Sequence, residues 1–85
     1  MSGDELKGVL TTRPRKFNSR NGYSGISAKL REDGGGEIWS VTVWRGRDDR
    51  PFETLLCCRK GSFVTLRGQI KSMSKNYFTA YEVRA

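Results

Sequence analysis

The chain has 85 residues and a formal net charge of +7, because 16 Lys and Arg stand against 9 Asp and Glu. This length predicts a single small domain, residues 1–85, with a modest core. No apolar run approaches the roughly 20 residues of a membrane helix, and no apolar signal-peptide stretch opens the chain. We therefore expect a cytoplasmic or nucleoid-associated protein without a membrane partner.

The residue types that most catalytic and metal sites need are scarce. The chain contains no His, which removes the commonest general acid/base and a common metal ligand. Its two Cys, Cys57 and Cys58, are adjacent; two thiolates alone do not form a structural zinc site, and adjacent Cys rarely meet disulfide geometry. No phosphate loop or nucleophile elbow is present. We expect no enzyme, no cofactor and no metal, and interpret both Cys as small apolar residues on a helix.

The first half of the chain predicts three strands. Residues 6–12 form the first, which ends before Pro14 because proline has no backbone N–H for a sheet ladder. After a basic connection, Asn21-Gly22 predicts a hairpin, since both residues tolerate positive φ. Residues 23–31 alternate between polar and apolar, which is typical of a half-buried strand.

A glycine-rich turn separates the second predicted strand from the third. Residues 33–36 (DGGG) have turn composition. Residues 38–44 are β-branched and aromatic, which favours a strand. By parity, Val41 and Val43 face the core together with Trp39, whereas Trp44 faces the other side.

The second half changes period. Phe52 and Leu55 begin a helical stripe, which predicts a helix over residues 51–59 with Gly61 as the residue that ends it. Alternation returns in residues 63–71, where Gly68 marks a bulge or bend. A basic loop, residues 71–76, precedes a last strand over residues 77–84. Three strands, one helix and two strands is the order of an OB-fold, an all-β five-stranded barrel with one short helix.

Three segments in chain order resemble the single-stranded DNA-binding protein family of bacteria, phages and plasmids, including primosomal relatives. Residues 8–14 (GVLTTRP) resemble its G-x-L-x-x-D-P run, with Arg13 in place of the acidic residue. Residues 41–44 (VTVW) resemble its apolar third strand, which ends in an aromatic. Residues 60–70 (KGSFVTLRGQI) resemble its K-G-x-x-V-x-V-x-G-x-L run.

The resemblance implies an OB-fold, single-stranded DNA as the partner, and a role in DNA replication, recombination or repair. Together with the small core, it also implies a homo-oligomer, either a dimer or a tetramer. Because the sequence ends at Ala85, we expect no acidic tail of the kind through which many members recruit replication and repair proteins.

Single strands are held by cations along the phosphates and by aromatic rings that stack on bases. In an OB-fold two loops flank the binding face, and we place most candidate cations in those loops. We interpret as phosphate contacts Arg13, Arg15, Lys16, Arg20, Lys29, Arg31, Arg45, Lys71 and Lys75. The alternative for this set is an ordinary solvated surface.

Four aromatic residues are candidates for base stacking: Trp44, Tyr23, Phe17 and Tyr77. Trp44 is the foremost because its parity places it beside Ser40 and Thr42. Its alternative role is packing in a subunit interface, and for the others it is packing at a strand edge. We expect Phe63 to cover the end of the helix.

These features predict sequence-tolerant binding of single-stranded DNA by phosphate neutralisation and base stacking, without catalysis. No predicted helix is free to read a major groove. Two alternatives remain open. One is an RNA-binding OB domain, which would use similar contacts; the other is a protein-binding adaptor on the same scaffold.

Overall fold

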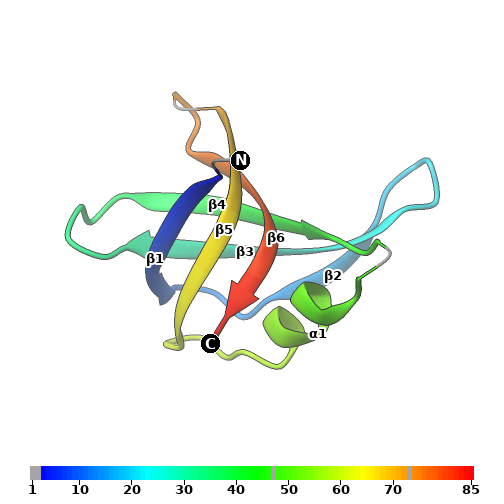
Figure 1. Cartoon of the computed structure of the whole chain (residues 1–85), viewed down its shortest axis with the longest axis horizontal. Helices are drawn as coiled ribbons and strands as arrows, with labels where there is room; N and C mark the ends of the chain where they lie inside the picture. Colours follow the sequence, from blue (N-terminus) through cyan, green and yellow to red (C-terminus); the bar gives the residue numbers. More distant parts are fainter. Residues whose placement is uncertain (1–2, 47, 73) are drawn as a thin grey trace.

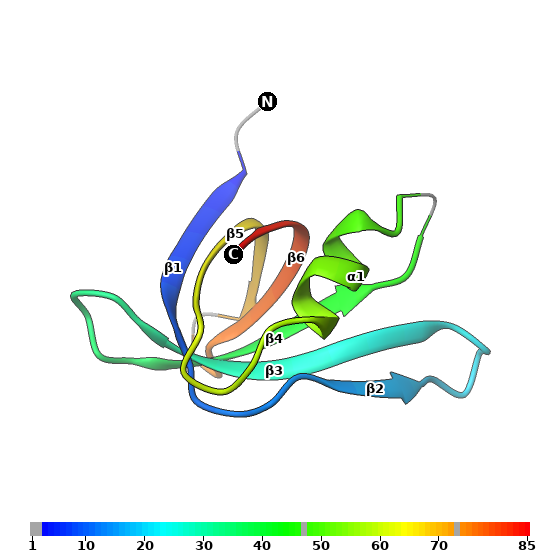
Figure 2. The ribbon, with the colours of Figure 1, turned by 90° about the horizontal axis from the view of Figure 1, so that it is seen from below.

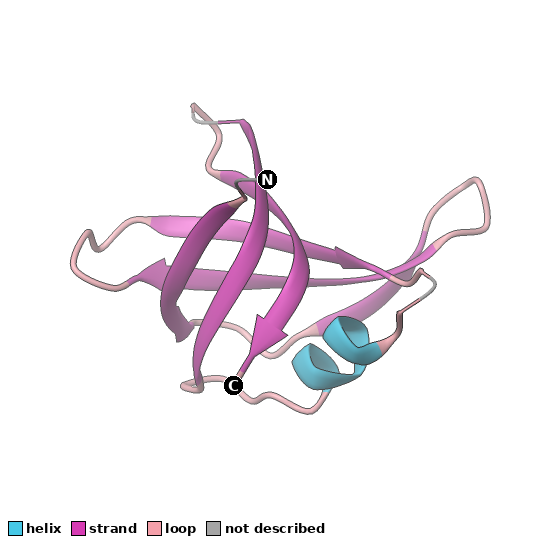
Figure 3. Ribbon diagram, viewed as in Figure 1, coloured by secondary structure: helices cyan, strands magenta, loops and turns pink. Residues whose placement is uncertain are grey.

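The computed structural model describes residues 3–46, 48–72 and 74–85. Within them, Figure 1 shows the elements in chain order as β1 (Asp4–Leu10), β2 (Arg15–Asn18), β3 (Ser24–Glu32), β4 (Ile38–Trp44), α1 (Arg50–Leu56), β5 (Phe63–Ser72) and β6 (Tyr77–Arg84). Figure 3 shows that strands dominate this part of the chain.

The strands form one sheet in the order β1-β5-β6-β4-β3-β2, and an additional pairing of β1 with β3 closes it. β1 pairs antiparallel with β5 on one side and with β3 on the other. β4 and β6 pair in parallel. Five of the strands therefore form a closed barrel, and the expected OB-fold is confirmed.

The sixth strand, β2, lies outside the barrel and was not expected. It pairs antiparallel with the first half of β3, from Arg15 opposite Ser27 to Asn18 opposite Ser24. The turn between them contains Gly22 at φ 82°, which confirms the predicted hairpin. Figures 1 and 2 show this hairpin extending beyond the barrel. Part of the predicted basic loop is therefore a strand, because β3 is long enough to pair with β1 at one end and β2 at the other.

The core follows the alternation of the sequence. Leu30, Val41 and Phe78 are almost fully buried, and Trp39 is 5% exposed and packs edge-on against Phe78 with ring centroids 6.5 Å apart. The indole Nε1–H of Trp39 donates to Glu32 Oε1 at 3.1 Å, so its polar atom is satisfied. Within the described ranges, sixteen buried apolar side chains form the core, and we expect their burial to contribute most of the favourable folding free energy.

Helix α1 closes one end of the barrel with Phe52 and Leu55, which are buried. It ends at Leu56, so the predicted extension to residue 59 is wrong. The N–H of Cys58 donates to the carbonyl of Leu55, and this i to i−3 bond tightens and ends the last turn. Gly61 has φ 92° but lies in the turn before β5 instead of ending the helix. Among the described residues, no helix is long and apolar enough to cross a membrane.

The two cysteines differ in environment. Both were expected on the helix, but both lie after its last residue, Leu56. Cys57 is exposed and Cys58 is buried, and both are free thiols. The Cys58 Sγ lies 3.2 Å from the Thr54 carbonyl oxygen, to which it donates. Burial, and secondarily the neighbouring Cys57, raises the pKa of the Cys58 thiol above its ordinary value. Only Cys58 therefore fits the interpretation as a small core residue.

Two glycines allow close backbone approaches that shape the barrel. A Cβ on Gly8 would collide with the Arg31 carbonyl, where β1 meets β3. A Cβ on Gly68 would collide with the Thr79 carbonyl, and the β5–β6 register shifts between Arg67 and Gly68. The bulge predicted at Gly68 is thus confirmed.

Phe63 was expected to cover the end of the helix, but it does not. It is 50% exposed on β5 and lies opposite Val9 of β1, which is 40% exposed.

Candidate nucleic-acid interface

The outer face of β2, β3, β4 and β6 gathers six of the thirteen candidate binding residues. Strand register sorts these residues into rows that run across the sheet. The rows are Phe17, Gly25 and Trp44; Arg15, Ser27, Thr42 and Thr79; Lys29, Ser40 and Tyr77; and Arg31 and Ile38. We call this surface the row face.

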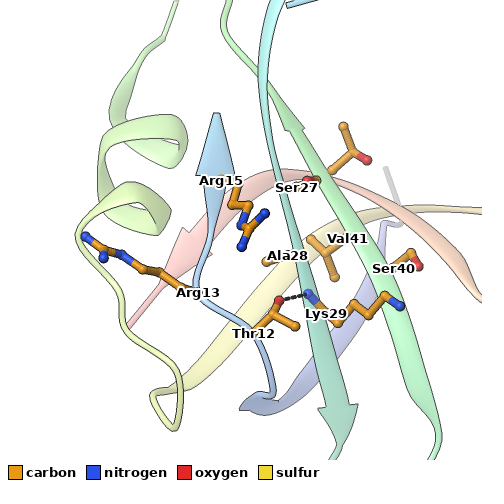
Figure 4. Close-up of a pocket in the computed structure, with 9 residues that line it drawn as sticks. Thr12, Arg13, Arg15, Ser27, Ala28, Lys29, Ser40 and Val41 are labelled. Atoms are coloured by element: carbon orange, nitrogen blue, oxygen red, sulfur yellow. Dashed lines mark hydrogen bonds between the residues drawn. The ribbon is translucent and has the colours of Figure 1, made fainter. Parts of the chain in front are cut away.

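A groove of about 440 Å³ lies at the centre of the row face. Figure 4 shows Arg15 from β2 and Lys29 from β3 directed over this groove, whereas Arg13 extends away at its edge. The backbone N–H of Lys29 donates to Thr12 Oγ1 at 3.0 Å, and the N–H of Thr11 donates to the Lys29 carbonyl at 2.8 Å. These bonds anchor the chain after β1 to β3 and fix the backbone that carries Lys29.

The small side chains of the row face leave the space that forms the groove. Its hydroxyl-bearing lining residues are Thr12, Ser27, Ser40 and Thr42. None of the four was predicted to bind, although Ser27 shares parity with Lys29 on β3, and Ser40 and Thr42 share it with Trp44 on β4. Hydroxyl groups can donate to phosphate oxygens, so the groove offers neutral donors beside its cations Arg13, Arg15 and Lys29.

A second groove, of about 210 Å³, continues the surface toward β6 and the loop before it. It shares Ser40 and Thr42 with the first groove and is bounded by Trp44, Tyr77 and Lys71. In the part of the chain that the structure describes, no carboxylate lines either groove. The two grooves thus form one continuous surface of positive charge.

Two exposed aromatic rings, those of Trp44 and Tyr77, border the second groove. Trp44 is 44% exposed and Tyr77 is 49% exposed. Phe17 packs edge-on against Trp44, with ring centroids 5.3 Å apart and an interplanar angle of 73°. Tyr23, 62% exposed, lies in the turn of the β2–β3 hairpin just before β3.

Three further candidate cations lie around the row face. Arg20 is exposed in the turn of the β2–β3 hairpin, and Lys75 is exposed in the loop between β5 and β6. Lys71 lies on β5 and donates to Gln69 Oε1 at 3.1 Å. The structure therefore brings the two predicted flanking loops to opposite sides of one surface.

Two candidate cations do not lie on the row face. Lys16 is opposite Ile26, whose side chain faces the core, so it lies on the other face of the hairpin. Arg45 follows Trp44 and turns toward the helix, with its guanidinium 5.5 Å from the Phe52 ring centroid and its Nε 3.5 Å from Asp49 Oδ1. Lys16 faces away because neighbouring residues on a strand face opposite sides, and Arg45 faces away because it lies beyond the end of β4 and turns toward α1.

Comparisons with known proteins agree with the topology. No family model and no curated protein sequence matches the chain. Among solved structures, it is similar to the SSB domain of a Synechococcus sp. protein, with a TM-score of 0.80 and 17% identity over 100% of this chain and 96% of that one.

It is also similar to the single-stranded DNA binding protein from Thermus aquaticus, with a TM-score of 0.75 and 19% identity. A deletion mutant of that protein gives a TM-score of 0.74 and 17% identity. These matches cover 99% of this chain but 39% and 40% of the Thermus aquaticus chains. At such identities the similarity shows the fold, so the resemblance noted in the sequence is confirmed for the fold.

Proposed function

We propose that this chain binds single-stranded DNA without sequence preference and without catalysis. The observation that carries the proposal is the row face: a continuous groove with Arg15 and Lys29 over it, the exposed rings of Trp44 and Tyr77 along it, and no carboxylate in its described lining. A basic groove with stacking platforms is the combination that single-strand binding requires. The name and fold of the structural neighbours support the same function.

Apart from Phe17 on β2, the cations and the rings of the row face lie on different strands. Arg15, Lys29 and Arg31 come from β2 and β3, whereas Trp44 and Tyr77 come from β4 and β6. This division suits a DNA single strand whose phosphates lie over β2 and β3 and whose bases lie over β4 and β6. The rows of Trp44 and Tyr77 are four residues apart, or about 13 Å along a strand, so more than one nucleotide fits between the two rings.

The remaining candidate residues extend this surface. Arg13, Arg20, Lys71 and Lys75 lie at its edges and would contact phosphates that enter or leave the groove. Tyr23 would stack on a base near the hairpin turn. Lys16 and Arg45 would contact the DNA only if the bound single strand continues around β2 to the other face.

We also propose that the chain assembles as a homo-oligomer, either a dimer or a tetramer, through the outer face of β1 and β5, which adjoins the row face where Val9 lies opposite Arg31. The exposed Val9 and Phe63 lie side by side there. Beside them run two charged rows, Glu5, Arg67 and Glu82, then Lys7, Thr65 and Arg84. A two-fold axis between the rows would place Glu5 opposite Lys7 and Glu82 opposite Arg84 of a second copy, so this face is complementary to itself.

The biological setting that we propose is DNA replication, recombination or repair at the cytoplasmic nucleoid. It follows from the binding of exposed single strands, which those processes generate.

Fluorescence titration with oligo-dT, oligo-rU and duplex DNA at two salt concentrations tests the proposal. We expect quenching by oligo-dT that weakens with salt, and much weaker binding of duplex, whose paired bases cannot reach the rings. Preference for oligo-rU would favour the RNA-binding alternative. Absence of binding at low salt would favour the protein-binding adaptor and contradict the proposal.

A further inference from the structure

Gly25 lies directly beneath the pair of rings formed by Phe17 and Trp44. It stands opposite Phe17 on β2 and opposite Trp44 on β4, so the three residues form one row across the sheet. A Cβ on Gly25 would lie 2.7 Å from Phe17 Cζ, 2.9 Å from Phe17 Cε1 and 3.3 Å from Trp44 Cε3. The two rings therefore occupy the space that a side chain at position 25 would take.

The backbone does not explain why this position is glycine. Gly25 is not among the glycines with positive φ, and it lies inside β3, where glycine weakens a strand. What distinguishes the position is the space above it. Phe17 uses that space to reach Trp44, and the edge-on contact limits the orientations available to the indole.

We propose that Gly25 is a positioning residue for base stacking: it provides the seat on which Phe17 holds Trp44 in the orientation that receives a base. In this arrangement Phe17 acts through Trp44 instead of stacking on a base itself. Trp44 keeps 44% of its surface exposed while one side is supported. This inference rests on the proposed function of the row face and assigns a role within it.

Gly25→Ala tests whether the absence of a side chain at position 25 is what lets Phe17 support Trp44, and we expect the variant to fold. The added methyl group collides chiefly with the far end of a flexible ring, so we expect Phe17 to swing away and the barrel to remain. Trp44 then loses its support, and we expect affinity for oligo-dT to fall roughly fivefold or more, within the range for loss of one base stack. Gly46→Ala is the matched control, because a Cβ there has nothing within 4 Å.

Incorporation of 5-fluorotryptophan gives a readout that a general loss of structure would not reproduce. Trp39 and Trp44 provide two fluorine resonances, and Trp44→Phe assigns them. In free Gly25→Ala protein we expect the Trp44 resonance to shift and the Trp39 resonance to stay. A shift of both would mean a rearranged barrel and would overturn the proposal.

Variants of Phe17 test the same contact from the other side. Phe17→Leu removes the ring but leaves Gly25 unchanged, and we expect the same Trp44 shift and a similar loss of affinity. Phe17→Tyr keeps the ring, and we expect it to retain wild-type affinity. Equal weakening by both variants would overturn the positioning role.

The outcomes separate this inference from the proposed function. If wild type binds oligo-dT and Gly25→Ala binds equally well with an unchanged Trp44 resonance, the seat is overturned and the function stands. If wild type does not bind oligo-dT, the proposed function fails and the stacking role of the seat fails with it. In that second case, an altered Trp44 resonance in free Gly25→Ala protein still identifies the packing contact.

Discussion

Trp39 and Trp44 lie on the same strand and on opposite faces of the barrel wall. Trp39 is 5% exposed, packs edge-on against Phe78 and donates its indole N–H to Glu32. Trp44 is 44% exposed and packs edge-on against Phe17 on the row face. One strand thus supplies a core aromatic and a surface aromatic, and the two should respond differently to substitution.

We expect Trp44→Ala to weaken oligo-dT binding and leave stability within about 1 kcal/mol of wild type. Loss of one base stack corresponds to about 1–3 kcal/mol of binding free energy. Trp39→Phe should lower the free energy of unfolding by about 2 kcal/mol, because core volume and the bond to Glu32 are lost. Urea unfolding measures the stability of both variants, and oligo-dT titration measures their affinity. Unchanged binding in Trp44→Ala would contradict the stacking role.

Arg15→Ala should lower the salt dependence of binding. Each phosphate contact on a single strand contributes about 0.7 to the slope of log affinity against log salt, so the slope should fall by about that amount. Arg84→Ala is the matched control, since it removes the same charge from outside the row face, where Arg84 pairs with Glu82 at 3.2 Å. Titrations of both variants with single-stranded oligonucleotides of different sequence, at several salt concentrations, measure the slope. A sequence-selective loss would argue against a phosphate contact.

Gly8→Ala should destabilise the barrel by about 3 kcal/mol, at the high end of ordinary single substitutions. Its Cβ would collide with the carbonyl of Arg31, at the point where β1 and β3 close the barrel. Chemical denaturation measures the effect, with Gly46→Ala expected to stay close to wild type. Equal stability of the two variants would mean that the closure tolerates a wider separation of β1 and β3.

Cys57 should react with iodoacetamide well before Cys58 at mildly alkaline pH. Cys57 is exposed, whereas burial raises the pKa of the Cys58 thiol and so reduces its reactive thiolate fraction. Because the folded pKa is raised, the Cys58 contribution to stability is present below the unfolded pKa and is lost as pH rises through the folded pKa. Mass spectrometry of alkylated Cys57→Ser and Cys58→Ser proteins checks the order. Rapid alkylation of Cys58 in folded protein would contradict it.

Phe63→Glu should reduce self-association if the Val9 and Phe63 face joins copies of the chain. Phe63 is 50% exposed, so the single domain should tolerate the charge, while an apolar interface should not. Ile38→Glu is the control, because Ile38 is also partly exposed, at 39%, but lies on β4, separated from Val9 by Arg31 of β3. Sedimentation equilibrium measures the masses. Equal mass for wild type and Phe63→Glu would place any interface elsewhere.

Alternation and composition predicted most of the elements. The strand over residues 38–44 was found with the bounds that the structure gives, and parity correctly separated Trp39 from Trp44. The hairpin at Asn21-Gly22 was also predicted, because its turn chemistry is local. These features depend on residues close in sequence, so the chain itself contains their signal.

Neither β2 nor the end of the helix at Leu56 was predicted from the sequence. β2 forms because its residues pair with the first half of β3. Its four residues include two cations and carry no alternation that would predict a strand. The helix ends early because the chain must turn at Cys58 to bring Ser62 to Leu10, whose N–H donates to the Ser62 carbonyl at 2.9 Å. Both features follow from pairings distant in sequence.

The sequence by itself determined the charge, the strand alternation and the faces on which Trp44, Lys29 and Val41 lie, because side chains alternate along any strand. Only the tertiary structure decided that four strands would place Arg15, Lys29, Trp44 and Tyr77 on one surface, and that Lys16 and Arg45 would face away from it. It also placed Phe17 and Trp44 over the empty position of Gly25. The physical reason is that strand register is set by closure of the whole barrel, a relationship between segments that no local pattern contains.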